Sequence, residues 1–261
     1  MLGWSLNLFR LRGILLAVHF SFFLLLAVNA FEGWAESGWP GLWWNTGALL
    51  AFFACVVLHE LGHSFTALHF GIGVRRILLM PIGGMAEFDS IPRQPRSELL
   101  ITLAGPAVNF VIAGMLWLLL PAGAGLPTAE PESDALTLLA FAHVLMRWNL
   151  VMGCFNLLPA FPMDGGRILR ALLATRMDYL RATFWAATVG KILSGAGAIA
   201  AFAYFEEPLL AALFVFIFFV GEMEYRATRR KEIEDAHLRD SLARLRELRA
   251  EFEDQQSVMR S

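Results

Sequence analysis

Charged residues are scarce in this chain of 261 residues, and cysteine is almost absent. Asp, Glu, Lys and Arg together make up 17% of the sequence, against roughly 25% in an average soluble domain, whereas 57% of the residues are hydrophobic. The formal net charge of −2 lacks the positive excess typical of nucleic-acid binding. Cys55 and Cys154 both lie in apolar segments, so we expect neither a structural disulfide nor a cysteine metal site.

Long apolar runs take the place of the missing charges. A helix needs about 20 mostly apolar residues to cross a bilayer, and six segments suit this role, although the last is short: 13–31, 46–70, 99–121, 135–158, 184–205 and 208–221. The first run follows Arg10 and Arg12, as in a signal peptide, but it is longer and lacks a clear cleavage site, so we expect it to be retained. The sequence therefore predicts an all-α polytopic membrane protein with about six transmembrane helices.

Basic residues alternate between successive connections. The N-terminal segment, the second and fourth loops and the tail carry arginines, whereas the first, third and fifth loops carry neither Lys nor Arg. Because Lys and Arg are retained on the cytoplasmic side, this alternation places both termini in the cytoplasm. We expect a prokaryotic plasma membrane, although an organelle remains an alternative.

Two connecting regions have a character of their own. Residues 73–89 combine β-branched and apolar residues with Pro81 and the pair Gly83–Gly84, which predicts a strand or small hairpin after the second span. This segment is either a structural connector or a strand that contacts substrate. Residues 222–261 are rich in Glu and Arg with leucines at helical spacing, and we separate them as a charged cytoplasmic helix from a membrane domain of residues 1–221. That helix either forms a homo-oligomer or is simply solvated.

The second predicted span carries three ionisable residues, His59, Glu60 and His63. A charged side chain at the centre of a membrane helix costs about 2.5–3.5 kcal/mol, so this cluster needs compensation. Two histidines four residues apart lie on one helix face and can share a zinc ion, with the intervening Glu as general base. The pattern therefore predicts metal chemistry inside the bilayer.

Catalytic zinc usually takes a third protein ligand and leaves one position for water. The best candidate is Asp164, which follows Pro159 and Pro162 and precedes Gly165 and Gly166 at the end of the fourth span. Irregular backbone at membrane depth is tolerated where it lines a cavity, which suits a ligand. The alternative is that Asp164 only caps the following helix.

Three motifs together resemble the site-2 protease family of intramembrane zinc metalloproteases (M50-type). They are HELGH, AGPAVN at 104–109 and FNLLPAFPMDGG at 155–166, and they occur in the order expected for that family. The segments LRGILLAVHFSFFLLL and PIGGMAEF are also similar. The loops and tail are too short for the PDZ or CBS domains of many relatives, so we expect a compact, prokaryotic-like member without them.

The resemblance implies roles for individual residues. His59, His63 and Asp164 would bind one Zn²⁺ per chain, and Glu60 would be the catalytic acid and base. Asn156 is implied to support substrate or oxyanion binding. We assign a substrate-binding role also to three residues of the other matching segments: Gly83, Gly84 and Asn109. The second, third and fourth spans would hold the site on the cytoplasmic side of mid-membrane.

The expected function is hydrolysis of peptide bonds within transmembrane segments, with a single-span membrane protein as substrate and the bilayer as surroundings. Two alternatives stay open: a membrane zinc transporter or sensor, and a catalytically inactive homologue that binds transmembrane segments. The pair His143 and Arg147 is either a gate or substrate contact or an inter-helix polar contact. For His19 we favour packing over metal ligation.

Overall fold

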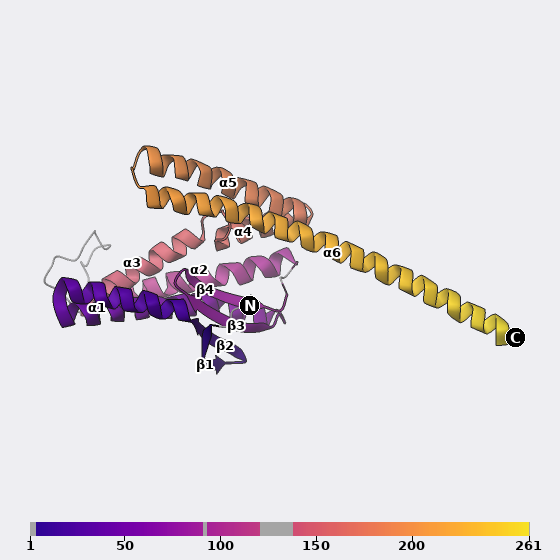
Figure 1. The fold of residues 1–261 in the computed structure, drawn as a ribbon, viewed down its shortest axis with the longest axis horizontal. Coiled ribbons are helices and arrows are strands. Elements are labelled where there is room, and N and C mark those ends of the chain that lie inside the picture. The colour runs from indigo at the N-terminus through magenta and orange to yellow at the C-terminus, as the bar shows by residue number, and fades with distance from the viewer. Residues whose placement is uncertain (1–3, 91–92, 121–137, 261) are drawn as a thin grey trace. The chain divides into compact units, whose positions relative to one another are not determined.

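The computed structural model describes residues 4–90, 93–120 and 138–260 (Figure 1). The third predicted loop and residues 135–137 of the fourth predicted span lie outside the described residues. The chain divides into two units, the first formed by Met1–Pro159 and Met163–Thr175, the second by Ala160–Pro162 and Arg176–Ser261. The prediction of a helical membrane protein with a small β segment is confirmed.

Helix α1 (Phe20–His69) contains the first two predicted spans, which meet at a break. Ser37 and Gly38 have non-helical backbone angles, and beyond them the chain runs back along the first half. The rings of Phe22 and Phe53 lie 4.7 Å apart between centroids, so the two halves contact each other. A Cβ at Gly33 would lie 2.4 Å from the carbonyl oxygen of Gly41, so this close approach requires glycine.

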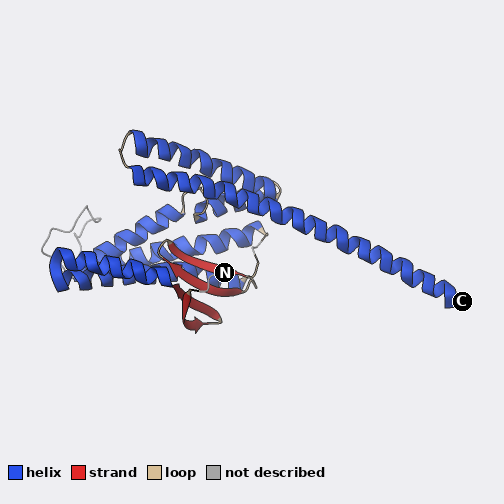
Figure 2. Cartoon of the chain, viewed as in Figure 1, coloured by secondary structure: helices blue, strands red, loops and turns tan. Residues whose placement is uncertain are grey.

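One four-stranded sheet lies in the first unit, with the order β1 (Ser5–Leu11), β2 (Ile14–His19), β3 (Val74–Met80) and β4 (Gly83–Phe88) (Figure 2). The two outer pairs are antiparallel and β2 pairs parallel with β3. Strands β3 and β4 form the hairpin predicted within residues 73–89. The sheet is larger than predicted because residues 14–19 form a strand and not the start of the first span.

The central strands of this sheet are the buried ones. Ile14, Leu16 and Ile77 pack with Ala67 of α1 and Ile101 in one core cluster. An apolar run that is buried on both faces reads as helix or strand with equal ease, because periodicity does not distinguish the two. That ambiguity explains why the sequence predicts a membrane span that already begins at residue 13.

Three helices follow the sheet in the first unit. Helix α2 (Pro95–Leu119) starts with a proline in its first turn. Proline lacks a backbone N–H, and at this position an N–H would have no acceptor within the helix. It packs against α1, α3 (Leu138–Asn156) and the short α4 (Asp164–Ala174). The region around α2 is therefore where residues from α1, α3 and α4 meet.

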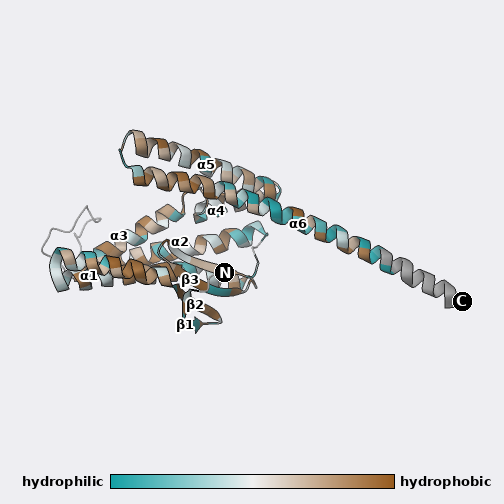
Figure 3. Cartoon of the chain, in the orientation of Figure 1, coloured by the Kyte–Doolittle hydropathy of each residue, from teal (hydrophilic) through white to brown (hydrophobic). Residues whose placement is uncertain are grey.

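The second unit is a pair of packed helices, α5 (Tyr179–Ala203) and α6 (Pro208–Arg260). Lys191 Nζ lies 2.9 Å from Glu222 Oε2, an ion pair between the two helices. Helix α6 passes from apolar to charged residues without interruption (Figure 3). The predicted boundary at 221–222 thus lies inside one continuous helix.

Five of the described helices are long and apolar enough to cross a membrane: α1, α2, α3, α5 and α6. Six spans were predicted, and the difference arises because α1 includes two of them on either side of its break. The chain is an integral membrane protein by the length and composition of these helices.

Candidate metal centre

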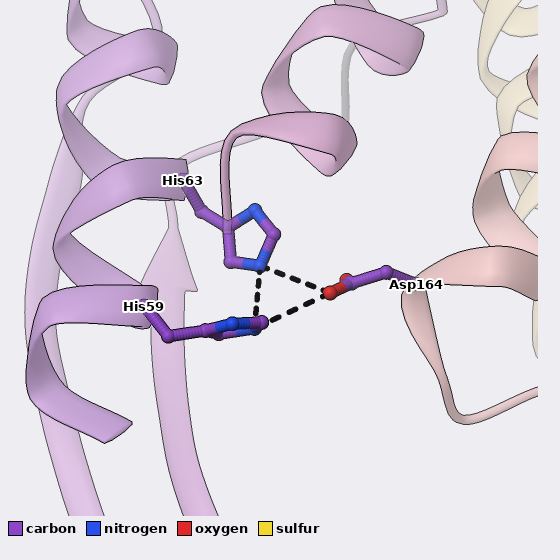
Figure 4. Close-up of side chains that lie close together, drawn as sticks. All are labelled: His59, His63 and Asp164. Carbon is purple, nitrogen blue, oxygen red and sulfur yellow. Dashed lines mark hydrogen bonds and ion pairs between the residues drawn. The ribbon is translucent and has the colours of Figure 1, made fainter. Parts of the chain in front are cut away.

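His59 and His63 lie one turn apart on the same face of α1, and both are buried. Their Nε2 atoms are 3.1 Å apart. Asp164 at the start of α4 points toward them, with Oδ2 at 3.3 Å from each Nε2 (Figure 4). Residues separated by about 100 positions in the sequence thus converge at one point, as the motifs predicted.

The cap of α4 separates the two interpretations of Asp164. The N-cap residue of this helix is Met163, and it makes no side-chain capping hydrogen bond. Asp164 is instead the first helical residue, and its carboxylate faces the two imidazoles. The arrangement therefore supports a ligand position and gives no sign of a capping role.

The hydrogen-bond partners of the two Nδ1 atoms indicate which ring nitrogen of each histidine carries the proton. His63 Nδ1 lies 2.7 Å from the carbonyl oxygen of Ile101, which can only accept a hydrogen bond. His59 Nδ1 lies 2.6 Å from Oδ1 of Asn109, which also accepts. Both Nδ1 atoms therefore carry a proton, and in neutral imidazoles each Nε2 presents an unshared electron pair.

The converging atoms fit a metal ion. Two Nε2 lone pairs and a carboxylate oxygen repel each other unless a cation lies between them, and no donor among the described residues satisfies Asp164 Oδ2. A tetrahedral site with ligand distances of about 2.0 Å has edges of about 3.3 Å, and the separations here are 3.1, 3.3 and 3.3 Å. Two imidazoles and one carboxylate are also the donor set of catalytic zinc sites.

Gly105 on α2 makes room for the two imidazoles. A Cβ built there would lie 2.2 Å from His63 Nε2 and 2.8 Å from His59 Cε1. On α1, a Cβ at Gly62, the residue before His63, would lie 2.8 Å from the carbonyl oxygen of Ala104. The glycines of HELGH and AGPAVN therefore let α1 and α2 approach closely enough to place both rings.

Glu60 lies beside the two histidines on α1 and extends along the edge strand β4. A Cβ at Gly84 would lie 2.6 Å from Glu60 Cγ, so the side chain of Glu60 occupies the space that Gly84 leaves open. Gly83, the preceding residue, has φ +130°, which an L-residue rarely adopts. The predicted pair of glycines thus positions β4 against the predicted catalytic carboxylate.

A buried ion pair holds the helix that carries Asp164. Glu98 on α2 and Arg170 on α4 are only 3% and 2% exposed, and Arg170 Nε lies 2.8 Å from Glu98 Oε1. Sequence reasoning missed this pair, because a Glu in the first turn of a helix is ordinary. A charged pair with such low exposure fixes the two helices relative to each other.

The remaining predicted residues have varied positions. Asn109 is fully buried behind His59, whereas Asn156 is the last residue of α3 and is half-buried. His19 caps α1, since its Nδ1 accepts a hydrogen bond from the Ser21 N–H at 3.2 Å. On α3, His143 is half-buried and Arg147 is exposed.

The hairpin beside Glu60 has an ion pair of its own. Arg76 on β3 lies 2.7 Å from Glu87 on β4, and its hydrogen bond holds the pKa of that carboxyl below the usual value. The pair links the two strands at a point where their register shifts, between Val74 and Arg76.

The sequence matches a protein family and several known proteins. The profile of peptidase family M50 matches residues 47–196, which include both histidines and Asp164. A zinc metalloprotease of Methanocaldococcus jannaschii is 39% identical over 193 residues, which are 74% of this chain and 52% of that protein. Rip3 of Mycobacterium tuberculosis is 29% identical over 199 residues, 73% of this chain and 49% of that protein. The chain thus spans about half the length of these curated relatives.

A solved structure agrees with the sequence matches. The site-2 protease from Methanocaldococcus jannaschii superposes with a TM-score of 0.58 and 34% identity, over 85% of this chain and 95% of that one. The family profile covers more than half of the chain and all three residues of the candidate metal centre. This chain belongs to peptidase family M50.

Proposed function

We propose that this protein is an intramembrane zinc endopeptidase that hydrolyses peptide bonds within transmembrane segments. One observation carries the proposal: two imidazole Nε2 atoms and a carboxylate oxygen converge in a buried site beside Glu60, and both histidines lie on a helix apolar enough to cross a membrane. The relatives named as zinc metalloproteases support the same assignment. A cluster of this kind in hydrocarbon is a functional site by default.

His59, His63 and Asp164 would hold the zinc ion, and the fourth position would be left for water or substrate. Zinc in such a site lowers the pKa of water to about 7 and polarises a carbonyl oxygen. Glu60 takes a proton from the attacking water and later gives it to the departing amide nitrogen. Its position against Gly84 supports this role, because the packing limits the directions in which the carboxylate can turn.

We assign substrate binding to the edge of β4. Among the described residues β4 pairs with β3 alone, so its other edge would take up an extended peptide by strand addition. Gly83 and Gly84 carry no side chains that would keep a peptide backbone away from Glu60. A single-span membrane protein, unwound locally, is the substrate that suits this arrangement, and Asn156 would support its scissile carbonyl.

The arginine pattern of the loops supports a plasma membrane location with both termini in the cytoplasm. Residues 1–221 would form the membrane-embedded protease, and residues 222–261 a cytoplasmic helix. Leu238, Leu242 and Leu245 are exposed on α6 at spacings of four and three residues, which favours pairing of this helix with a second copy. The predicted stripe continues to Leu248 and Phe252, whose side chains lie outside the described residues.

Cleavage of a single-span substrate in proteoliposomes tests the proposal, with wild type compared to Glu60→Gln and Asp164→Asn. We expect Glu60→Gln to keep its zinc and lose cleavage, and Asp164→Asn to lose both. Equal cleavage by Glu60→Gln and wild type would refute the mechanism. Zinc flux that survives in Glu60→Gln would indicate a transporter, and substrate binding by zinc-loaded wild type without cleavage would indicate an inactive homologue.

A further inference from the structure

The two histidines of the metal centre are fixed in different ways. His63 Nδ1 donates to a main-chain carbonyl, the oxygen of Ile101, and a carbonyl oxygen cannot turn into a donor. His59 Nδ1 faces the side-chain amide of Asn109. An amide presents either its oxygen or its NH₂ group, so the tautomer of His59 depends on what fixes the orientation of Asn109.

A chain of hydrogen bonds sets that orientation, starting from a main-chain oxygen. Asn149 Nδ2 donates to the carbonyl oxygen of Leu145 at 2.8 Å, so its Oδ1 points the other way. That Oδ1 accepts from Asn109 Nδ2 at 2.9 Å. Asn109 therefore turns its own Oδ1 toward His59 Nδ1, at 2.6 Å.

Burial keeps water from replacing any link of this chain. The residues Asn109 and Asn149 both have 0% exposure, and His59 has 5%. The chain of bonds begins on α3, crosses α2 and ends on α1, so it depends on the packing of three helices. A second, weaker contact joins Asn149 Nδ2 to Cys55 Sγ at 3.3 Å.

We propose that Asn149 is a positioning residue of the metal centre: through Asn109 it keeps the proton of His59 on Nδ1, which leaves the Nε2 lone pair for the metal. This inference rests on the zinc site of the proposed function. Without Asn149, the amide of Asn109 is free to turn and present NH₂ to Nδ1. The tautomer of His59 with its proton on Nε2 then gains population, and zinc has to displace that proton in order to bind.

The test uses the purified full-length chain in detergent, with zinc affinity measured by competition with a chromophoric chelator. Asn149→Leu removes the acceptor for Asn109 at nearly constant volume, and we expect zinc affinity to fall by about 10–100-fold, the usual effect of losing such an outer contact. Cys55→Ala is the matched control, since it removes only the weaker contact of Asn149 and should leave the affinity unchanged.

A second substitution distinguishes positioning from general damage. In Asn109→Asp both side-chain oxygens accept, so His59 keeps its acceptor in either orientation, and Asn149→Leu should no longer weaken zinc binding. We expect Asn109→Asp/Asn149→Leu to bind zinc as well as Asn109→Asp alone. An equal loss in the presence and absence of Asn109→Asp would overturn the proposal, as would wild-type affinity in Asn149→Leu.

Nitrogen-15 NMR of the histidines adds a measurement made on the wild-type protein itself. In zinc-free wild type, the His59 ring, assigned by the signals lost in His59→Gln, should carry its proton on Nδ1. A proton on Nε2 would overturn the inference. If wild type binds zinc but cleaves nothing, the proposed protease activity fails and this inference stands, whereas wild type that binds no zinc overturns both.

Discussion

Replacing Gly105 with alanine adds one methyl group at the point where α2 meets the two imidazoles. The new Cβ would lie 2.2 Å from His63 Nε2, 2.4 Å from His63 Cε1 and 2.8 Å from His59 Cε1. Ordinary carbon contacts begin at about 3.5 Å, so the His63 ring has to move by more than about 1 Å. Metal–ligand distances tolerate deviations of only about 0.2 Å. We therefore expect Gly105→Ala to abolish tight zinc binding.

The same change should destabilise the fold by about 1–3 kcal/mol, the usual cost of overpacking a core. Gly114→Ala is the matched control, because it lies on the same helix and no atom of the described residues lies within 4 Å of its added Cβ. Alanine within a helix is more stable than glycine by roughly 0.5–1 kcal/mol, so this control should unfold at the same or a higher temperature. Chelator competition and thermal unfolding of both variants measure these effects, and zinc affinity of Gly105→Ala equal to wild type would refute the steric argument.

Three further outcomes are expected. Glu98→Leu should lower the free energy of unfolding, measured by denaturant titration, by about 3–5 kcal/mol, because it leaves the buried Arg170 guanidinium without this carboxylate. Adding Arg170→Met should recover most of the loss. Gly84→Ala should keep zinc but cleave about 100-fold more slowly, because its Cβ displaces Glu60; unchanged turnover would contradict this placement of the base. Removing zinc with a chelator should abolish cleavage and lower the unfolding temperature, and added zinc, but not magnesium, should restore both.

The three residues of the candidate metal centre were predictable to different degrees. That His59 and His63 share one face follows from helix periodicity, since they are four residues apart, and the apolar surroundings of the HELGH pattern predict metal binding. Asp164 lies about 100 residues further on, so its assignment depended on the broken backbone around it and on the resemblance to a family. Only the structure shows that Met163, and not Asp164, is the N-cap residue of α4, which favours the ligand interpretation.

Contacts between distant segments account for what the sequence did not reveal. The strand Ile14–His19 was assigned to a helix because its apolar run has no distinguishing period. The hairpin of β3 and β4 was predicted, because Pro81 and the two glycines are local turn signals. Asn149, Glu98 and Arg170 owe their roles to helix packing, which no local pattern encodes.

The two histidines differ in how strongly they depend on the side chains of neighbouring residues. The Nδ1 proton of His63 is held by the main-chain oxygen of Ile101, and nearly every amino acid at position 101 would supply the same oxygen. The Nδ1 proton of His59 is held by a side chain, so one nucleotide change at codon 109 removes its partner. Substitutions that weaken metal binding without changing His59, His63 or Asp164 should therefore be found more often among the residues that contact His59 than among those that contact His63.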